Sequence, residues 1–183
     1  MNSFMHFNDL SVYTYIENFD ANLILNLPKK ISLIYRNYQK KDLEEIFRIK
    51  NLCKKISRKF YISNDIKLAI KLDIDGAYIP SFNKCLNIRY IKFKKNFELI
   101  GSAHNLKEIR TKEIQNVSKI FLSPIFKTDK SNNYLGIFRF LKLKDYSNKD
   151  IICLGGIKKN NIKKLKLIKP EGFAAISLFR QII

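Results

Sequence analysis

The sequence predicts a compact α/β protein, a (β/α)8 TIM-type barrel of parallel strands that is slightly trimmed in length. Two observations lead to this fold class. Short runs rich in Ile, Phe, Tyr and Leu recur along the 183 residues, and amphipathic or polar segments separate them, as in β/α repeats. The runs are apolar on both sides, which is typical of parallel strands that helices cover.

An open doubly wound sheet is the alternative fold, because it also consists of β/α repeats. That fold commonly carries G-x-G-x-x-G after its first strand, and this sequence has no such motif there. No linker, low-complexity tract or obvious repeat marks a boundary within the chain. The sequence therefore predicts one domain over residues 1–183.

The strands are predicted from the apolar runs themselves. In chain order the predicted strands span residues 11–17, 31–38, 59–64, 76–80, 97–104, 119–126, 150–157 and 172–179.

The most amphipathic of the predicted helices spans residues 41–59, with basic residues in its last turns, where the helix dipole favours them. Its predicted apolar face consists of Leu43, Ile46, Phe47, Ile49 and Ile56. Further helices are predicted at residues 65–72, 105–117, 134–143 and 160–168. The segments after Ser11 and after Pro80 give weaker helix signals.

The charge of the chain is strongly positive. It contains 35 Lys and Arg against 16 Asp and Glu, a net charge of +19, which alone favours a nucleic-acid or anionic-membrane partner. The lysines are scattered as single residues and short pairs, however, without a long basic block. This distribution argues against a nucleic-acid partner, and a diffuse positive field attracts small phosphorylated substrates without a special patch.

Cysteine usage and hydropathy indicate a cytoplasmic protein. Cys53, Cys85 and Cys153 are odd in number and lack a C-x-x-C spacing, so neither a disulfide framework nor a zinc site is predicted. No apolar run approaches the roughly 20 residues of a membrane-spanning helix. The first residues also lack a secretion signal. We expect reduced thiols and no membrane partner.

In a barrel of this kind, function resides at the carboxyl ends of the strands and in the loops that follow them. Gly155 and Gly156 follow the seventh predicted strand, and glycines let backbone N–H groups approach an anion closely. Ser177 opens a short helix after the eighth strand, and a helix N-terminus favours negative charge. The two glycines together with Ser177 predict a phosphate site. A Gly-Gly pair can also simply end a strand.

Six segments at these strand ends follow one another in the order and spacing of a known family. The segments are IYRNY, SNDIKLAIKLDIDGAYI, IGSAHNLKEI, LSPIFKTDK, CLGGIKKNNI and GFAAIS. From Ile31 to Ser177 the chain thereby resembles the thiamine-phosphate synthases and the related TenI proteins, as a diverged member. The resemblance implies a transferase that joins hydroxymethylpyrimidine diphosphate to thiazole phosphate, with Mg²⁺ on the diphosphate and pyrophosphate as the leaving group.

The resemblance also implies roles for individual residues. Arg36 would contact the diphosphate, Ser102 would bind a phosphate oxygen, and Lys130, with Thr128 beside it, would neutralise charge on the leaving group. Fixed cations and donors suit a reaction that expels an anion. The residues implied for the thiazole phosphate are Gly155, Gly156, Ile176 and Ser177.

His104 supports a different reaction on the same fold. It matches the histidine that serves TenI proteins as acid–base catalyst in isomerising a thiazole carboxylate phosphate, and an imidazole suits such proton transfer. A polar strand-end residue without catalytic duty is the alternative reading. His6 lies in an N-terminal segment that we expect to be uninvolved.

The metal site is where the chain departs most from the family. Asp65 is the predicted Mg²⁺ ligand, but alignment from the other side places Asn64 at the metal-binding aspartate. The second acidic ligand, expected near Phe82 and Asn83, is not evident. Because Mg²⁺ on a diphosphate normally takes one or two carboxylates, the departures weaken the pyrimidine half of the site.

Four readings of function therefore stay open. They are the synthase, the TenI-like tautomerase, a non-catalytic phosphate-binding paralogue and, outside the barrel readings, a basic nucleic-acid-binding protein. The sequence also leaves open whether the chain forms a homo-oligomer.

Overall fold

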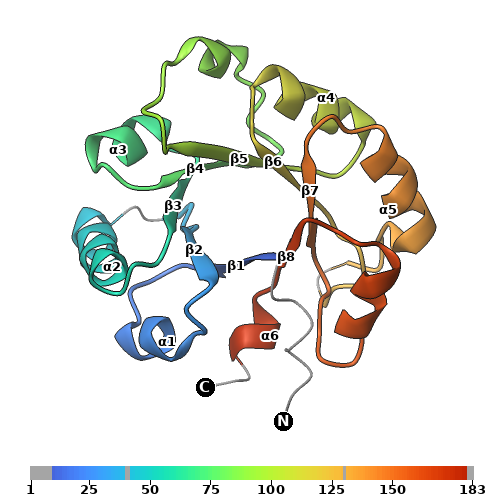
Figure 1. Ribbon diagram of the computed structural model, residues 1–183, viewed down its shortest axis with the longest axis horizontal. Coiled ribbons are helices and arrows are strands. Elements are labelled where there is room, and N and C mark those ends of the chain that lie inside the picture. Colours follow the sequence, from blue (N-terminus) through green and yellow to red (C-terminus); the bar gives the residue numbers. More distant parts are fainter. Residues whose placement is uncertain (1–9, 40–41, 130, 181–183) are drawn as a thin grey trace.

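The fold is a closed barrel of eight parallel strands, as the sequence predicts. A computed structural model describes residues 10–39, 42–129 and 131–180. Each strand pairs with the next in the chain, and β8 pairs with β1 to close the ring, with helices outside it (Figure 1). The strands are β1 Ser11–Ile16, β2 Ile31–Tyr35, β3 Phe60–Ser63, β4 Gly76–Ile79, β5 Glu98–Ala103, β6 Lys119–Leu122, β7 Asp150–Leu154 and β8 Gly172–Ala174.

The predicted strands start within one residue of the observed ones but extend too far at their carboxyl ends. The sixth was predicted to run to residue 126, whereas β6 ends at Leu122. Pro124 has no backbone N–H and cannot continue a ladder there. The eighth was predicted to run to residue 179, whereas β8 ends at Ala174 and a helix begins at Ser177.

The helices lie where the sequence predicts most of them, with shorter bounds. They are α1 Ala21–Asn26, α2 Leu43–Lys55, α3 Ile66–Lys71, α4 Leu106–Ile114, α5 Gly136–Asp145 and α6 Ser177–Arg180. The two 3-10 helices are η1 Leu86–Tyr90 and η2 Ile162–Leu167. The segment predicted as an α-helix at residues 160–168 is therefore a 3-10 helix.

The predicted apolar face of α2 is partly wrong. Ile46, Ile49 and Cys53 are fully buried, whereas Leu43 is 53% and Phe47 45% exposed. Each residue advances roughly 100° around an α-helix, so Phe47 lies well away from the stripe that its neighbour Ile46 begins. The buried stripe is consequently narrower than the apolar content of the segment indicates.

The interior of the barrel is filled with aromatic and aliphatic side chains. The cluster consists of Tyr13, Tyr15, Ile34, Tyr61, Tyr78, Ile100, Phe121, Ile152 and Ala174. The ring centroids of Tyr13 and Phe121 are 4.9 Å apart, and those of Phe121 and Tyr78 are 5.5 Å apart. Because this interior is packed, a ligand has to bind above it, where the carboxyl ends of the strands meet.

Candidate functional site

The turn after β7 is built from two glycines that no other residue would replace without strain. Gly155 and Gly156 have φ angles of 94° and 69°, in the left-handed region. A Cβ on Gly155 would lie 2.7 Å from Cβ of Pro124, and one on Gly156 would collide with the carbonyl oxygens of Phe126 and Lys127. Backbone conformation and close packing therefore both require glycine here.

Asn161 fixes the far side of the same turn. Its Nδ2 donates to the carbonyl oxygen of Gly156 at 2.7 Å, and its Oδ1 accepts from the backbone N–H of Lys158 at 2.8 Å. Asn161 was not among the predicted site residues. Its position five residues after the glycine is the kind of local signal from which an Asn side chain closing a turn can be predicted.

A basic cavity of about 610 Å³ opens beside this turn. Thr128 and Gly156, which the resemblance implies as phosphate contacts, both line it. Lys127, Lys158 and Lys164 line it as well, and Lys158 Nζ lies 2.8 Å from Asp129 Oδ1. The structure thus brings two predicted residues together among cations. The predicted Lys130 lies outside the described residues.

Ile176 and Ser177 leave the barrel next to the glycine turn. Leu154 at the end of β7 pairs with Ala174 at the end of β8, so the segments that follow these strands start side by side. Ser177 is exposed and opens α6, as predicted, while Ile176 packs on the interior cluster. A phosphate contact from Ile176 would accordingly come from its backbone.

His104 lies in a second cavity of about 380 Å³, with Ser123, Tyr134 and Arg139. Its Nδ1 is 2.8 Å from the carbonyl oxygen of Ser123. Because a carbonyl only accepts, Nδ1 carries a proton, and in the neutral imidazole the lone pair is on Nε2. The backbone N–H of His104 donates to Glu108 Oε2 at 2.7 Å, which holds the strand end in place.

Tyr134 lines both cavities, so the histidine and the glycine turn share one wall. Tyr134 and Arg139 were not among the predicted site residues. They lie in and after a loop, and their approach to His104 depends on how α5 packs, for which the sequence has no local signal.

Arg36 stands on the opposite side of the barrel mouth. Its guanidinium carbon is 4.2 Å from the centroid of the Tyr15 ring, a cation–π contact that orients the charge. Its backbone N–H donates to the carbonyl oxygen of Ile16 at 2.8 Å. Burial raises the pKa of Tyr15 well above its ordinary value, so the ring remains a neutral support for Arg36.

Ser102 is buried at the end of β5, only 4% exposed. It lies against the hydroxyl of Tyr78, where burial raises the pKa of that phenol and the hydrogen bond with Ser102 opposes the rise. The hydroxyl of Ser102 is therefore already hydrogen-bonded to Tyr78 in the interior of the barrel. A ligand oxygen would reach it only from directly above Tyr78.

The ends of β3 and β4 offer one carboxylate, that of the predicted Mg²⁺ ligand Asp65. Asp65 is the N-cap of α3, and its Oδ1 accepts from the backbone N–H of Leu68 at 3.0 Å. Within residues 10–39, 42–129 and 131–180, no three His, Cys, Asp or Glu side chains gather closely enough to hold a metal ion. Asn83 lies where the resemblance expects the second carboxylate, and its Nδ2 donates to Oδ1 of Asn64 at 2.7 Å.

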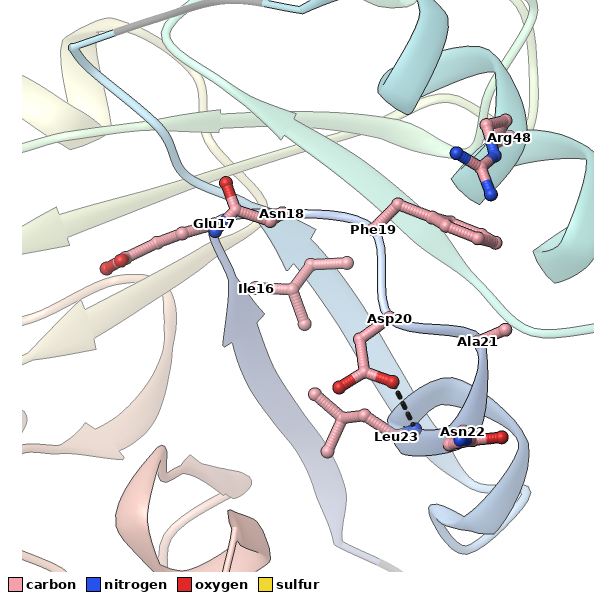
Figure 2. A pocket seen from close by; sticks show the side chains of 9 residues that line it. All are labelled: Ile16, Glu17, Asn18, Phe19, Asp20, Ala21, Asn22, Leu23 and Arg48. Carbon is pink, nitrogen blue, oxygen red and sulfur yellow. Dashed lines mark hydrogen bonds between the residues drawn. The ribbon is translucent and has the colours of Figure 1, made fainter.

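A third cavity, of about 880 Å³, lies outside the predicted site, between the β1–α1 loop and α2. Figure 2 shows Arg48 facing Phe19, with the guanidinium carbon 4.1 Å from the ring centroid, and Asp20 reaching the N–H of Leu23 to cap α1. These polar groups stabilise the β1–α1 loop and the start of α1. None of the predicted site residues lines this cavity.

Fold and site together define a (β/α)8 barrel with a basic, glycine-walled cavity and an arginine at its carboxyl-terminal face. The family described as "Thiamine monophosphate synthase" matches residues 25–179. The chain belongs to this family.

The relatives agree with this assignment. A thiamine-phosphate synthase of Prochlorococcus marinus is 30% identical over 162 residues, which cover 85% of this chain and 46% of the relative. One of Lactococcus lactis is 27% identical, covering 94% of this chain and 88% of the relative. The solved thiamine phosphate pyrophosphorylase of Pyrococcus furiosus superposes with a TM-score of 0.74 at 17% identity, covering 96% of each chain.

The chain spans about half the length of its Prochlorococcus relative and about two thirds of a Streptococcus pneumoniae one. Within the part of the chain that the structure describes, no helix is long and apolar enough to cross a membrane.

Proposed function

We propose that this protein condenses hydroxymethylpyrimidine diphosphate with thiazole phosphate to give thiamine phosphate and pyrophosphate. It would act as a cytoplasmic transferase of thiamine biosynthesis, with a single domain. The observation that carries the proposal is the Gly155–Gly156 turn beside a lysine-lined cavity, in a chain whose relatives are named thiamine-phosphate synthases.

The positions of the charged groups support this reaction. The thiazole phosphate is assigned to the cavity of Gly156 and Thr128, together with the backbone at Gly155, Ile176 and Ser177. Arg36, oriented by Tyr15, is assigned to the diphosphate, with Lys130 as the cation for the leaving group and Ser102 as a donor. Arg36 follows β2, which lies across the closed ring from β6 and the cavity that follows it.

In this reaction the thiazole nitrogen forms a bond to the pyrimidine methylene carbon as the bond from that carbon to the diphosphate oxygen breaks. The electron pair of the broken bond leaves with pyrophosphate. Positive charge grows on the pyrimidine and negative charge on the leaving group, so preorganised cations lower the barrier. Arg36 and Lys130 supply those cations without any proton transfer.

The resemblance also implies Mg²⁺, which would add positive charge to a bound diphosphate. The side chains at the β3 and β4 ends offer one carboxylate, Asp65, which also caps α3. Asp65 remains the predicted ligand if the ion is carried in by the substrate. A homo-oligomer likewise remains a prediction.

The test is a condensation assay that follows thiamine phosphate, with Arg36→Ala as the variant and Arg48→Ala as its matched control. Both arginines stack on an aromatic ring at similar distance, but only Arg36 stands at the mouth. We expect Arg36→Ala to lower kcat/KM by about 100-fold, as for loss of a fixed charge near a transition state, and Arg48→Ala to lower it by less than about threefold.

Absence of product with the unchanged protein would reject the synthase. Saturable binding of thiazole phosphate in that case would indicate the tautomerase or the non-catalytic paralogue.

The His104 geometry favours a second candidate, a TenI-like thiazole tautomerase. The Nδ1–H donated to Ser123 leaves Nε2 as a base beside Arg139 and Tyr134. Isomerisation of a thiazole carboxylate phosphate that is abolished in His104→Gln would support it, provided that condensation by the same variant is unchanged. Equal rates of isomerisation by the unchanged protein and His104→Gln would exclude His104 as the catalyst.

A further inference from the structure

The amino ends of the strands form a second face of the barrel, at the end away from the candidate site. Two neighbouring cavities open there, of about 390 Å³ and about 310 Å³, a size that suits small molecules. Their lining residues lie at or next to the starts of β1, β2, β3, β4 and β6, and in the last turns of α2. Ser57 and Lys59 line both cavities, so the two meet at the segment between α2 and β3.

Cations outnumber carboxylates in the lining of these cavities. The two lining carboxylates already have partners, because Asp73 pairs with Lys94 and Asp75 Oδ2 accepts the backbone N–H of Phe60 at 2.9 Å. Seven cationic side chains line the cavities, namely Lys29, Lys30, Lys50, Lys54, Arg58, Lys59 and Lys119.

Glu98, at the start of β5, offsets part of this charge. Its Oε1 lies 3.3 Å from Nζ of Lys59 and 3.6 Å from Nζ of Lys119, so two ammonium groups share one carboxylate. Each ammonium has three N–H groups and keeps donors for another partner. The seven lining cations therefore face only three carboxylates, and the face attracts anions.

Arg58 adds a buried charge to the wall of the larger cavity, and it is only 5% exposed. Its Nη1 donates to the carbonyl oxygens of Pro28 and Ile31 at 2.9 and 2.5 Å, and its Nη2 donates to that of Leu27 at 2.8 Å. Its Nε is buried without a partner, and among the described residues no carboxylate forms a salt bridge with it. Because a buried charge is costly unless an opposite charge is near, an anion in the cavity would stabilise this guanidinium.

Hydroxyl groups accompany the lysines of the smaller cavity. Ser11, Ser32 and Tyr13 line it, and burial raises the pKa of Tyr13 to about 12, so this phenol stays protonated. Ammonium and hydroxyl groups together are donors from which phosphate oxygens accept. The aromatic residues among the described lining, Tyr13 and Phe60, are both buried, so they offer no face on which the bases of a nucleic acid could stack. The lining favours a small phosphorylated anion over a nucleic acid.

We propose that these two cavities form a second anion site, which binds a compact anion with two or more linked phosphate groups. Lys54 and Lys59 donate to its oxygens, and the buried charge of Arg58 attracts it. Linked phosphates suit the site better than a single phosphate, because one group can enter each of the two cavities that share Lys59. The site lies at the other end of the barrel from the glycine turn, so the inference does not depend on the proposed function.

The test is an NMR titration of the full chain with inorganic triphosphate in EDTA, because separate resonances report the two ends of the barrel. The backbone amides of Ser57 and Phe60 and the Nε–H of Arg58 should shift saturably with one common Kd. The amide of Gly156 reports binding at the carboxyl end. Arg58 is observed rather than replaced, since its three hydrogen bonds hold the loop before β2.

Two double variants keep the test decisive. Lys54→Gln/Lys59→Gln should raise the Kd at the amino end at least about tenfold, because two charged donors are lost. Lys67→Gln/Lys142→Gln is the matched control, because it removes the same charge from exposed lysines of α3 and α5 that line neither cavity. Its Kd at the amino end should stay within about twofold of that of the unchanged protein.

No saturable shift at Ser57, Phe60 and Arg58 would overturn the inference, even if the condensation assay succeeds. An equal rise of Kd in the two double variants would overturn it too, because diffuse charge alone would then attract the anion. A single-stranded oligouridylate that displaces triphosphate at a lower concentration would replace the small anion by a nucleic acid. Saturable shifts at the amino end without any at Gly156 would support the inference and would count only against the proposed phosphate contact of the glycine turn.

Discussion

At the scale of single residues, the glycine turn is the feature on which phosphate binding most depends. Gly156 has a left-handed backbone, and its Cα lies close to two carbonyl oxygens. A methyl group added there would strain the backbone and would also collide with these oxygens. Gly136, at the start of α5, is left-handed as well, with φ of 67°. A Cβ there would meet only a ring carbon of Tyr134 at 4.0 Å.

We therefore expect Gly156→Ala to weaken binding of thiazole phosphate at least about tenfold, because the turn has to move out of place. Gly136→Ala should leave the affinity unchanged and should cost only the roughly 1–2 kcal/mol of free energy of unfolding of a left-handed alanine. Calorimetric titration of both variants measures this. Equal affinities for the two variants would show that the turn does not touch the phosphate.

The sequence could predict the glycine turn after β7 but not the roles of the two polar residues after β3. Two adjacent glycines after an apolar run indicate a strand end that needs positive φ, which the structure confirms for Gly155 and Gly156. At the end of β3, the sequence could not decide which of Asn64 and Asp65 matches the family's metal-binding aspartate. Which of the two caps α3 depends on a hydrogen bond to Leu68, and either residue type is a good N-cap.

At the scale of elements, the buried Lys112 couples α4 to the loop after β4. Burial lowers the pKa of Lys112 to about 8, and its amino group donates to neutral acceptors on Asn83 and Gln115. A neutral amine can still make both hydrogen bonds. Nothing in the sequence signals this contact, because the two segments lie about 30 residues apart and Lys is normally a surface residue.

The stability of the protein should consequently rise with pH in a window set by Lys112. Its pKa is lowered by folding, so between about 8 and 10.5 the unfolded chain binds more protons than the folded one. The free energy of unfolding then increases with pH through this window. Lys112→Met should remove that increase, measured as the difference between the two proteins in urea unfolding at pH 7.5 and pH 10.

The difference in unfolding free energy between the unchanged protein and Lys112→Met cancels the contributions of the other lysines and tyrosines that titrate between these pH values. A parallel pH dependence in the two proteins would mean that Lys112 keeps its ordinary pKa in the folded state.

At the scale of the whole molecule, the packed interior determines that the site lies at the mouth. Phe121 is fully buried and touches Tyr13 and Tyr78 from across the barrel. The barrel class could be predicted because apolar-on-both-sides strands recur with helices between them. The carboxyl ends of the strands could not be predicted closely, since apolar residues such as Ile125 and Phe126 follow Pro124 after β6 has ended.

Removal of Phe121 should therefore destabilise the whole barrel. We expect Phe121→Ala to lower the free energy of unfolding by about 3–5 kcal/mol, the usual cost of a large cavity. Phe138→Ala is the control, because Phe138 is 89% exposed on α5, and it should change stability by less than about 0.5 kcal/mol. Similar unfolding midpoints for both variants would contradict the packed interior.

The central claim is that this barrel joins two phosphorylated rings and expels pyrophosphate. The most direct measurement is the ratio of thiamine phosphate formed to pyrophosphate released when the purified protein receives both substrates, compared with each substrate alone. The account predicts equal amounts of the two products with both substrates and neither product with one. Pyrophosphate released from the diphosphate alone, or no product from the pair, would contradict it.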